Sequence, residues 1–251
     1  MTRTRVIVLM FHRVNDASLN HSPVQFANYL NYLVQNFPIV LPGDPIPDDV
    51  PLAICLTFDD AYFDFYHNVY PLLQQHQIKA LLAVPVKYIV ENTTLSTQTR
   101  LSVPYAHDME DPSYATKVPF CTWEELREMA QSPNVVIASH GFRHANLSDR
   151  KVDLSQEITI SQAILQLKLN QPVQHFVYPF GRTSNLARKK IQETYDYGLR
   201  IGGALNYKWN EKTRFLYRIN ADPLWTQHIP IHPALVKKLT FKYWLNRLRD
   251  K

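Results

Sequence analysis

Short, mostly apolar runs that stop abruptly at polar residues recur along this chain and predict its strands. Residues 52–58 and 135–139 are the clearest, because their apolar side chains follow one another with little interruption and then give way to acids or histidines. Runs of this length are typical of strands buried on both faces. Between them, apolar residues recur at three- and four-residue steps, which predicts helices over residues 22–37 and 154–169.

The remaining segments continue this alternation. Further strands are predicted over residues 6–11, 78–84, 174–178 and 198–204. Further helices are predicted over residues 63–75, 123–131 and 185–195. Strands that alternate with helices in this way predict a parallel α/β sheet closed into a barrel. No internal repeat or second domain is visible, so residues 1–251 are predicted to form a single domain.

Two segments depart from the pattern. Residues 88–119 have no regular spacing of apolar residues. Loops of this length within a compact domain are usually either functional or disordered. Residues 234–250 are basic and carry apolar and aromatic residues at near-helical spacing. Such a helix either packs its apolar stripe on the domain or lies in a membrane interface with its cations toward acidic lipid. The pattern leaves both readings open.

Composition narrows the class of protein. The 251 residues are 45% hydrophobic and 20% charged, which is ordinary for a soluble globular protein with a sizeable core. The net charge is +5, but no Lys/Arg block dominates, so we predict no nucleic-acid partner. Cys55 and Cys121 are predicted to be reduced, buried thiols. The apolar run over 6–11 is too short for a secretory or membrane segment, which predicts a cytoplasmic protein.

Two adjacent carboxylates, Asp59 and Asp60, end the central strand. The carboxyl ends of parallel strands are where α/β proteins place their chemistry. Two acids at such a position repel each other unless a cation lies between or beside them, and a divalent metal would serve. The alternative is a turn or a helix cap, in which Asp is common.

Two histidines, His140 and His144, follow the strand over 135–139. In a helical turn or a tight loop, this spacing can bring both imidazoles to one side. Two neutral imidazoles and one carboxylate form a ligand set that leaves positions open for water and substrate. Together with the Asp pair, the two histidines predict a metal site.

Two other strand ends carry candidates. Pro179 stops the strand over 174–178, which frees the N–H of Phe180 to act as an oxyanion donor unless the turn is an ordinary one. The first strand ends at His12. His12 would face the same cleft if all strand ends share one rim, and would otherwise hydrogen-bond only to backbone.

Three motifs together resemble the polysaccharide deacetylase family: Thr57-Phe58-Asp59-Asp60, Ser139-His140-Gly141-Phe142-Arg143-His144 and Tyr178-Pro179-Phe180-Gly181. The resemblance extends from Val6 to about Ala204. The aromatic-His pair Phe11-His12 resembles the branch that includes biofilm-polysaccharide deacetylases. The family consists of metal-dependent carbohydrate esterases that remove N-acetyl or O-acetyl groups from glycans. The resemblance therefore implies a distorted (β/α) barrel, of seven strands.

The resemblance also implies roles for the first two motifs. Asp60, His140 and His144 would bind a divalent cation, zinc before others, although such a site accepts several divalent ions. The cation would activate a water and polarise the acetyl carbonyl. Asp59 would take the proton of that water as general base.

The third motif would serve the substrate. The N–H of Phe180 would hold the tetrahedral oxyanion together with the metal. Tyr178 and Pro179, which precede it, would contact the substrate.

Departures from the family pattern concern the base and the acid. Val177 stands where the family commonly has an arginine that tethers the base, so Asp59 is predicted to lack that tether. No Asp-x-x-Asp-Trp segment is visible, and no Leu-x-His matches the usual general acid. His228 and His232 are the nearest candidates for this acid, and His12 is a competing donor.

We therefore predict a metal-dependent deacetylase that removes acetyl groups, N-acetyl first, from a glycan or a lipid-linked sugar, in the cytoplasm or at the inner membrane face. One alternative is a barrel that binds glycan or metal without turnover, which the missing motifs favour. The other is a metal-dependent amidase on a non-sugar substrate. In the segment over 88–119, Tyr105 or Tyr114 would stack on a sugar ring if the segment is a lid, and would contact no substrate if it is not.

Overall fold

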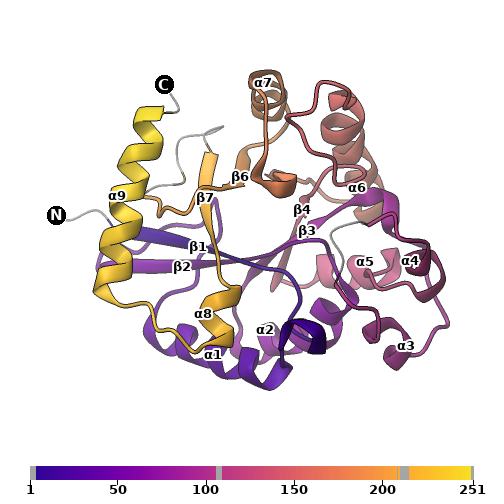
Figure 1. Cartoon of the computed structure of the whole chain (residues 1–251), viewed down its shortest axis with the longest axis horizontal. Helices are drawn as coiled ribbons and strands as arrows, with labels where there is room; N and C mark the ends of the chain where they lie inside the picture. Colours follow the sequence, from indigo (N-terminus) through magenta and orange to yellow (C-terminus); the bar gives the residue numbers. More distant parts are fainter. Residues whose placement is uncertain (1–3, 106–108, 208, 210–214, 250–251) are drawn as a thin grey trace.

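Seven parallel strands close into a barrel in the order of the sequence, with β7 pairing back to β1 (Figure 1). The structure is a computed structural model that describes residues 4–105, 109–207, 209 and 215–249. The strands are β1 (Arg5–Phe11), β2 (Leu52–Phe58), β3 (Ala80–Val84), β4 (Val135–Ser139), β5 (His175–Val177), β6 (Tyr197–Ile201) and β7 (Phe215–Asn220). Because the pairs are parallel throughout, the carboxyl ends of the strands lie on one rim of the barrel.

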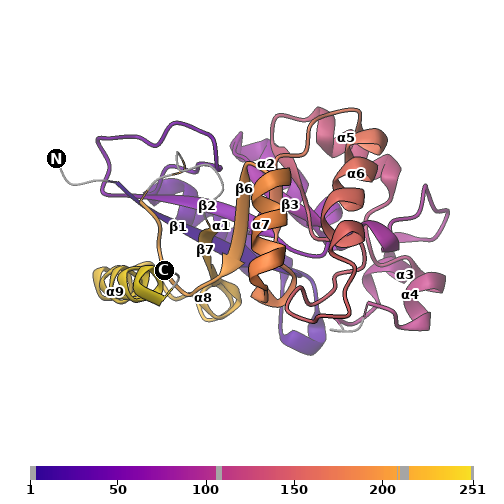
Figure 2. The ribbon, with the colours of Figure 1, turned by 90° about the horizontal axis from the view of Figure 1, so that it is seen from above.

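Helices surround this barrel (Figure 2). The longer ones are α1 (Pro23–Asn36), α5 (Trp123–Gln131), α6 (Ser161–Leu169), α7 (Asn185–Thr194) and α9 (Pro233–Arg249). The shorter α-helices are α2 (Tyr70–His76), α3 (Thr97–Leu101), α4 (Pro112–Lys117) and α8 (Asp222–Thr226). Single turns of other helix types are η1 (Ala17–Leu19), η2 (Phe65–Val69), η3 (Val86–Tyr88), η4 (Ser155–Ile160) and η5 (Pro179–Gly181). In both views α9 lies at one end of the molecule, and α5 and α6 lie at the other.

Local sequence explains where several elements begin. A capping box opens α5: the Thr122 hydroxyl accepts the N–H of Glu125, and the Glu125 carboxylate accepts the N–H of Thr122. Pro23 occupies the start of α1, where its missing N–H leaves no hydrogen bond unmade. All of β2 is buried, as expected for a strand covered on both faces.

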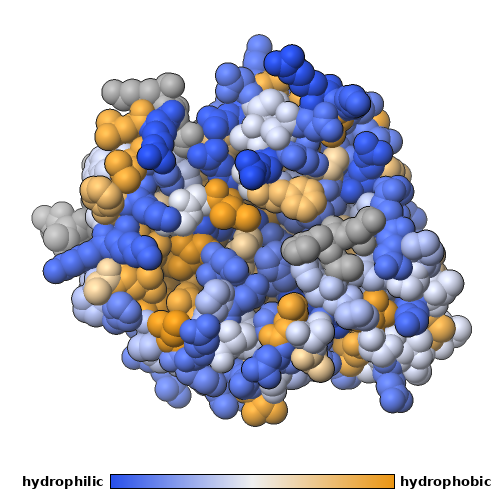
Figure 3. Space-filling model, viewed as in Figure 1, coloured by the Kyte–Doolittle hydropathy of each residue, from blue (hydrophilic) through white to orange (hydrophobic). Residues whose placement is uncertain are grey.

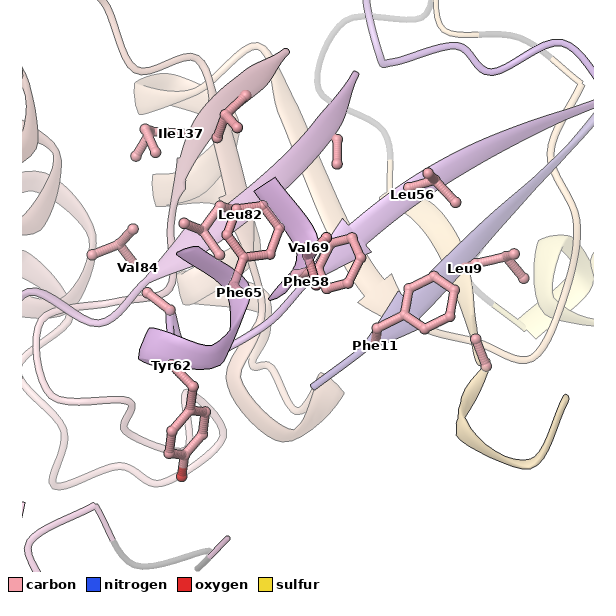
Figure 4. Packing of buried hydrophobic residues seen from close by; sticks show 14 of the residues in the cluster. Leu9, Phe11, Leu56, Phe58, Tyr62, Phe65, Val69, Leu82, Val84 and Ile137 are labelled. Carbon is pink, nitrogen blue, oxygen red and sulfur yellow. The ribbon is translucent and has the colours of Figure 1, made fainter. Parts of the chain in front are cut away.

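The strands separate two apolar clusters. Every second strand side chain points into the barrel, where small and branched residues such as Val8, Cys55 and Ala83 fill the interior. The alternate side chains point outward to the helices (Figure 4), and there Phe11 stacks on Phe58 with ring centroids 5.0 Å apart. This alternation decides which strand residues reach the inside of the rim.

Most of the predicted elements are confirmed. The barrel has the expected seven parallel strands, and the helices predicted over 22–37 and 123–131 correspond to α1 and α5. Cys55 and Cys121 are free and buried, as predicted. β7 and α8 were not predicted, and they lie beyond the last segment that the sequence pattern assigns to the barrel.

The irregular segment over 88–119 contains two short helices, α3 and α4, and residues 106–108 lie outside the described part of the chain. Tyr114 is buried against Tyr62 and Phe120, which rules it out as a platform for a sugar ring. Tyr105 lies in the wall of the cavity described below. Across the described ranges, no helix combines the length and apolar content that a bilayer span requires.

Candidate active site

At the rim of the barrel, polar side chains occupy the last inward-facing positions of the strands. On β2 the inward alternation runs from Cys55 through Thr57 to Asp59. The Asp59 N–H still donates to the Phe11 carbonyl of β1 at 2.9 Å, so the residue is held as part of the sheet. On β1 the same alternation ends at His12. The strand period of two therefore delivers the acid and the histidine to one place.

These residues surround a cavity of about 450 Å³ at the carboxyl ends of the strands, a size typical of small-ligand sites. The space-filling view is hollowed near its centre at this position (Figure 3). The polar lining comprises His12, His21, Asp59, Asp60, His140, His144, Asn220 and Asp222. Leu19, Phe180 and Ile201 add an apolar rim and are 44%, 46% and 42% exposed.

Asp60, His140 and His144 each bring one ligand atom to within 4.8 Å of the others. Oδ1 of Asp60 lies 3.5 Å from Nε2 of His140 and 3.6 Å from Nε2 of His144. This oxygen is buried and has no hydrogen-bond partner among the described residues, which is unfavourable unless a cation binds it. One carboxylate and two imidazoles that converge on such an oxygen fit a divalent cation.

The protonation of these side chains suits a cation. Nδ1 of His140 donates to the Val177 carbonyl at 2.8 Å, which fixes the ring with its Nε2 facing Asp60. Burial and the neighbouring His140 lower the pKa of His144 to about 4, so this imidazole is neutral near pH 7. Burial acts to raise the pKa of Asp60, but the two histidines hold it below its usual value, and the carboxylate stays ionised.

The loop that carries the two histidines wraps around one buried carboxylate. Oε2 of Glu157, in η4, accepts the N–H of Phe142 at 3.0 Å and those of Arg143 and Ala145 at 3.3 and 3.4 Å. Gly141 permits this approach, because a Cβ there would lie 2.5 Å from the same oxygen. Its φ of +83° also favours glycine. Glu157 therefore fixes the backbone between the two candidate ligands.

Asp59 is held by Arg218, which reaches it from β7. Nη1 donates to Oδ1 at 2.6 Å and Nη2 to Oδ2 at 2.9 Å, a bidentate pair between two buried side chains. The prediction that Asp59 lacks a tether, which rested on Val177, is therefore wrong, because the arginine comes from another strand. Burial acts to raise the pKa of Asp59, but the charges of Arg218 and His140 hold it well below its usual range.

His12 lies in the same cavity and is paired with Asp222, the first residue of α8. Its Nδ1 lies 3.2 Å from Oδ2 of Asp222, and the edge of the Tyr105 ring packs against it. Burial acts to lower the pKa of His12, but the hydrogen bond to Asp222 and the charges of Asp59 and Asp60 raise it to about 9. His12 is thus a protonated imidazole near pH 7, with its orientation set by Asp222.

The turn after β5 brings only one of its three predicted residues to the cavity. Phe180 lies at the rim, with its ring centroid 4.5 Å from that of His144. The N–H groups of Gly181 and Arg182 close the turn on the Tyr178 and Pro179 carbonyls, so these bonds do not use the Phe180 N–H. Tyr178 and Pro179 are buried and line no part of the cavity. This corrects the prediction that they contact substrate.

The two late histidines lie elsewhere. His232 is exposed at the start of α9, where its Nδ1 accepts the N–H of Leu235 at 3.2 Å. His228 is exposed in the turn that follows α8. Neither is among the residues that line the cavity. The structure therefore does not bring His232 to a position from which it could act as general acid, which corrects that prediction.

Three functional candidates were missed by the sequence analysis: Arg218, Asn220 and Asp222. A usable signal was present in the run from Leu216 to Asn220, where apolar and aromatic residues flank an arginine. A buried guanidinium requires an acidic partner, so an arginine at an inward strand position points to a carboxylate across the barrel.

Rare backbone conformations gather at the same rim. Asp60, Ala61, His144 and Phe180 have φ values of 71°, 51°, 59° and 56°. Residues other than glycine adopt this region at a cost of about 1–3 kcal/mol, and such positions cluster at functional sites. The rim is therefore a place where the surrounding structure holds the backbone against its local preference.

Comparison with known proteins places these residues in a family context. The profile of the polysaccharide deacetylase family matches residues 49–200, a span that includes Asp59, Asp60, His140 and His144. A poly-beta-1,6-N-acetyl-D-glucosamine N-deacetylase of Escherichia coli (strain K12) is 37% identical over 98 residues, which are 39% of this chain and 12% of that protein. The chain thus aligns with only about an eighth of the length of this relative.

Solved structures share the fold. A de-N-acetylase from Aggregatibacter actinomycetemcomitans superposes with a TM-score of 0.66 at 20% identity, over 94% of this chain and 99% of that one. IcaB from Ammonifex degensii superposes with a TM-score of 0.63 at 21% identity, over 89% of this chain and 97% of that one. At these identities the likeness concerns the fold.

Proposed function

The chain belongs to the polysaccharide deacetylase family, and on this premise we propose that it hydrolyses the acetyl groups of an N-acetylated glycan with a bound divalent cation. One observation carries the proposal. A single cavity contains a candidate cation site, an ionised carboxylate and a protonated histidine. Amide hydrolysis needs an activated water, a base that takes its proton and an acid that protonates the leaving nitrogen.

Asp60, His140 and His144 would hold the cation, with zinc as the expected ion. Asp60 is the carboxylate suited to this task, because its Oδ1 lacks a hydrogen-bond partner among the described residues, whereas both oxygens of Asp59 already accept from Arg218. When bound, a divalent cation lowers the pKa of a water molecule and polarises the acetyl carbonyl.

Asp59 would accept the proton of the attacking water. Arg218 keeps this carboxylate ionised and fixes both of its oxygens, so its orientation is set before substrate binds. Its strongly lowered pKa makes Asp59 a weak base. A weak base is adequate if the cation has already lowered the pKa of the water. The arginine that holds the base and the cation site would therefore act on the same water, which explains why they lie side by side.

His12 would protonate the leaving nitrogen. Its pKa of about 9 keeps the imidazole protonated at neutral pH. The Nδ1 contact with Asp222 orients the ring, which leaves Nε2 as the atom that can deliver a proton to the substrate. The N–H of Phe180 would hold the oxyanion at the rim.

The charge of the cavity supports a neutral substrate. Asp59 is paired with Arg218, Asp222 with His12, and Asp60 would bind the cation. No lysine or arginine is among the described residues that line the cavity. A cavity whose carboxylates are already paired in this way, with no lysine or arginine among the described lining residues to bind added anionic groups, accommodates a neutral acetamido sugar better than a polyanionic glycan. The Escherichia coli relative is a poly-beta-1,6-N-acetyl-D-glucosamine N-deacetylase, which supports the same substrate class. A lipid-linked acetamido sugar is the second form of substrate to test.

The test is acetate release by the zinc-loaded protein from N-acetylglucosamine oligomers, acetylated lipid-linked sugars and simple acetamides. We expect release from a sugar, and a rate about 10²–10⁴-fold lower for Asp59→Asn, while the zinc content stays the same. Chelation should abolish release and added zinc should restore it.

Two results would favour the other functions. Equal rates on simple acetamides and on sugars would indicate an amidase that acts on non-sugar substrates. Stoichiometric zinc and saturable oligomer binding, without acetate release from any substrate in the panel, would indicate a glycan-binding barrel without turnover.

A further inference from the structure

The last helix, α9, has two apolar faces: one is buried against the protein, and the other is mostly exposed, with a ring contact between Trp244 and Tyr207 at a centroid distance of 6.2 Å. Val236 and Leu239 are buried against the barrel. On the same side Asn246 donates to the Gly202 carbonyl at 2.9 Å. These contacts hold the helix in place along its length and account for one of its faces.

The other face carries Phe241, Trp244 and Leu248, which we call the outer stripe. Steps of three and four residues put these side chains on one side of a helix. They are 65%, 58% and 65% exposed. Single exposed hydrophobic residues are common, but three on consecutive turns of one face form a patch that marks an interaction surface. The space-filling view shows apolar surface over α9, bordered by hydrophilic surface (Figure 3).

Cations border the outer stripe. Within Pro233–Arg249 there are five Lys or Arg residues and no acid. Lys237 and Lys238 are exposed and lie within four residues of Phe241, and Arg249 is exposed beside Leu248, whereas the side chain of Lys242 lies against Gly203. Long lysine stems can lie along apolar surface while their ammonium groups reach outward to anions. An apolar centre with a purely cationic border is complementary to the acyl region and phosphates of an anionic bilayer.

The same charges argue against a second copy of the chain as the occupant. A two-fold contact through the outer stripe would place each set of lysines against its own copy. Like charges brought together in this way destabilise the contact. An anionic lipid surface has no such conflict, and Trp244 is of the residue type that favours the headgroup region.

We propose that α9 docks the protein, through the outer stripe and its lysines, on the surface of an anionic membrane. Docking would bring the substrate cavity close to that surface. Asn246 contacts Gly202, which follows Ile201, and Ile201 belongs to the apolar rim of the cavity. The proposal concerns where the protein is held, and it stands whether or not the cavity is a deacetylase site.

The fluorescence of Trp244 can report contact between α9 and a membrane. Trp123, Trp209 and Trp225 are 4%, 5% and 0% exposed, whereas Trp244 is 58% exposed. Full-length protein is mixed with vesicles of phosphatidylcholine alone or with a third phosphatidylglycerol. We expect co-sedimentation and a blue shift of tryptophan emission with the anionic vesicles only, and loss of both in high salt.

Matched variants locate the contact. Phe241→Ser with Leu248→Ser should lower vesicle partitioning at least tenfold, with unchanged thermal unfolding and acetate release. Leu167→Ser replaces a leucine that is 81% exposed on α6 and should leave partitioning unchanged. Lys237→Gln with Lys238→Gln should weaken binding to anionic vesicles severalfold.

Three outcomes would overturn the proposal. The first is no partitioning of the wild type onto anionic vesicles. The second is partitioning that the Phe241 and Leu248 changes leave intact. The third is a dimer in light scattering that the same two changes dissociate, which would make the outer stripe a contact between copies of the chain.

Discussion

The cavity has two halves that are built in different ways. One half, which we call the metal half after the cation site proposed there, comprises Asp60, His140 and His144. The other half, which we call the proton-transfer half after its proposed role, comprises His12, Asp59, Arg218 and Asp222. The metal half comes from short motifs at the ends of β2 and β4, and its loop is organised by backbone N–H groups around Glu157. The proton-transfer half consists of two charge pairs whose partners lie 210 and 159 residues apart in the chain.

This difference distinguishes two ways in which the protein holds the side chains of the cavity. Backbone hydrogen bonds to a buried carboxylate fix where ligand atoms lie, and they act on cation affinity. Charge pairs fix which protonation state a side chain adopts, and they act on rate and on its pH dependence. If this division is correct, a change in one half should leave the property of the other half nearly intact.

The largest effect is expected from His12→Gln. Loss of the proton donor should lower kcat for acetate release by about 10²–10⁴-fold, because the leaving nitrogen departs poorly without protonation. The zinc dissociation constant should stay within a factor of two of the wild type, since His12 is outside the metal half. Parallel losses of kcat and zinc affinity would show that the two halves act as one unit.

A large loss of stability is expected from Arg218→Met. The change leaves the buried Asp59 charge unpaired, which should lower the free energy of unfolding by about 3–5 kcal/mol in urea titrations. The double variant with Asp59→Asn should recover much of this loss, because the unpaired charge is gone. If the double variant is as unstable as the single one, the guanidinium acts by packing and the charge pair does not hold Asp59.

A smaller effect, confined to the metal half, is expected from Glu157→Gln. The amide keeps the volume but is a poorer acceptor for three backbone N–H groups, so zinc affinity should fall by about 10–100-fold in a competition titration with a chelator. Glu193→Gln on the surface of α7 is the matched control and should bind zinc normally. Wild-type zinc affinity in Glu157→Gln would contradict the role of this carboxylate in fixing the histidine loop.

The smallest effect at neutral pH is expected from Asp222→Asn. Asp222 helps to raise the pKa of His12 to about 9, so the acid form persists through neutral pH and the rate falls as pH rises through that pKa. Without this carboxylate the descending limb should move to lower pH, toward the ordinary histidine value of about 6.5. The rate at pH 6 should change little. A descending limb that does not move would assign it to another group.

The same division explains which parts of the cavity could be predicted from the sequence. The runs over 52–58 and 135–139 and their polar ends led to β2, β4 and the metal half, because each candidate ligand lies within a few residues of its strand end. Arg218 could not be assigned in this way. Nothing local in Phe215–Asn220 says which carboxylate its arginine meets, and the partner is 159 residues away.

Wrong predictions of which side chains face the cavity have a similar origin. Tyr178 belongs to a matching motif, but the motif does not say which of its side chains faces the cavity. In β5, which has only three residues, the alternation is too short to decide this from sequence. His232 was a candidate acid because the family's acid motif comes late in the chain, whereas the structure places the competing candidate, His12, in the cavity next to Asp222.

The bond between Arg218 and Asp59 also ties catalysis to the order of synthesis. The ribosome releases β2 and the metal half long before β7, the strand that pairs with both β6 and β1 and completes the ring. Until β7 arrives, Asp59 has no guanidinium beside it. A growing chain can therefore possess the proposed cation ligands without the arginine that holds the proposed base, and competence for the proposed hydrolysis would be acquired only in the step that closes the barrel.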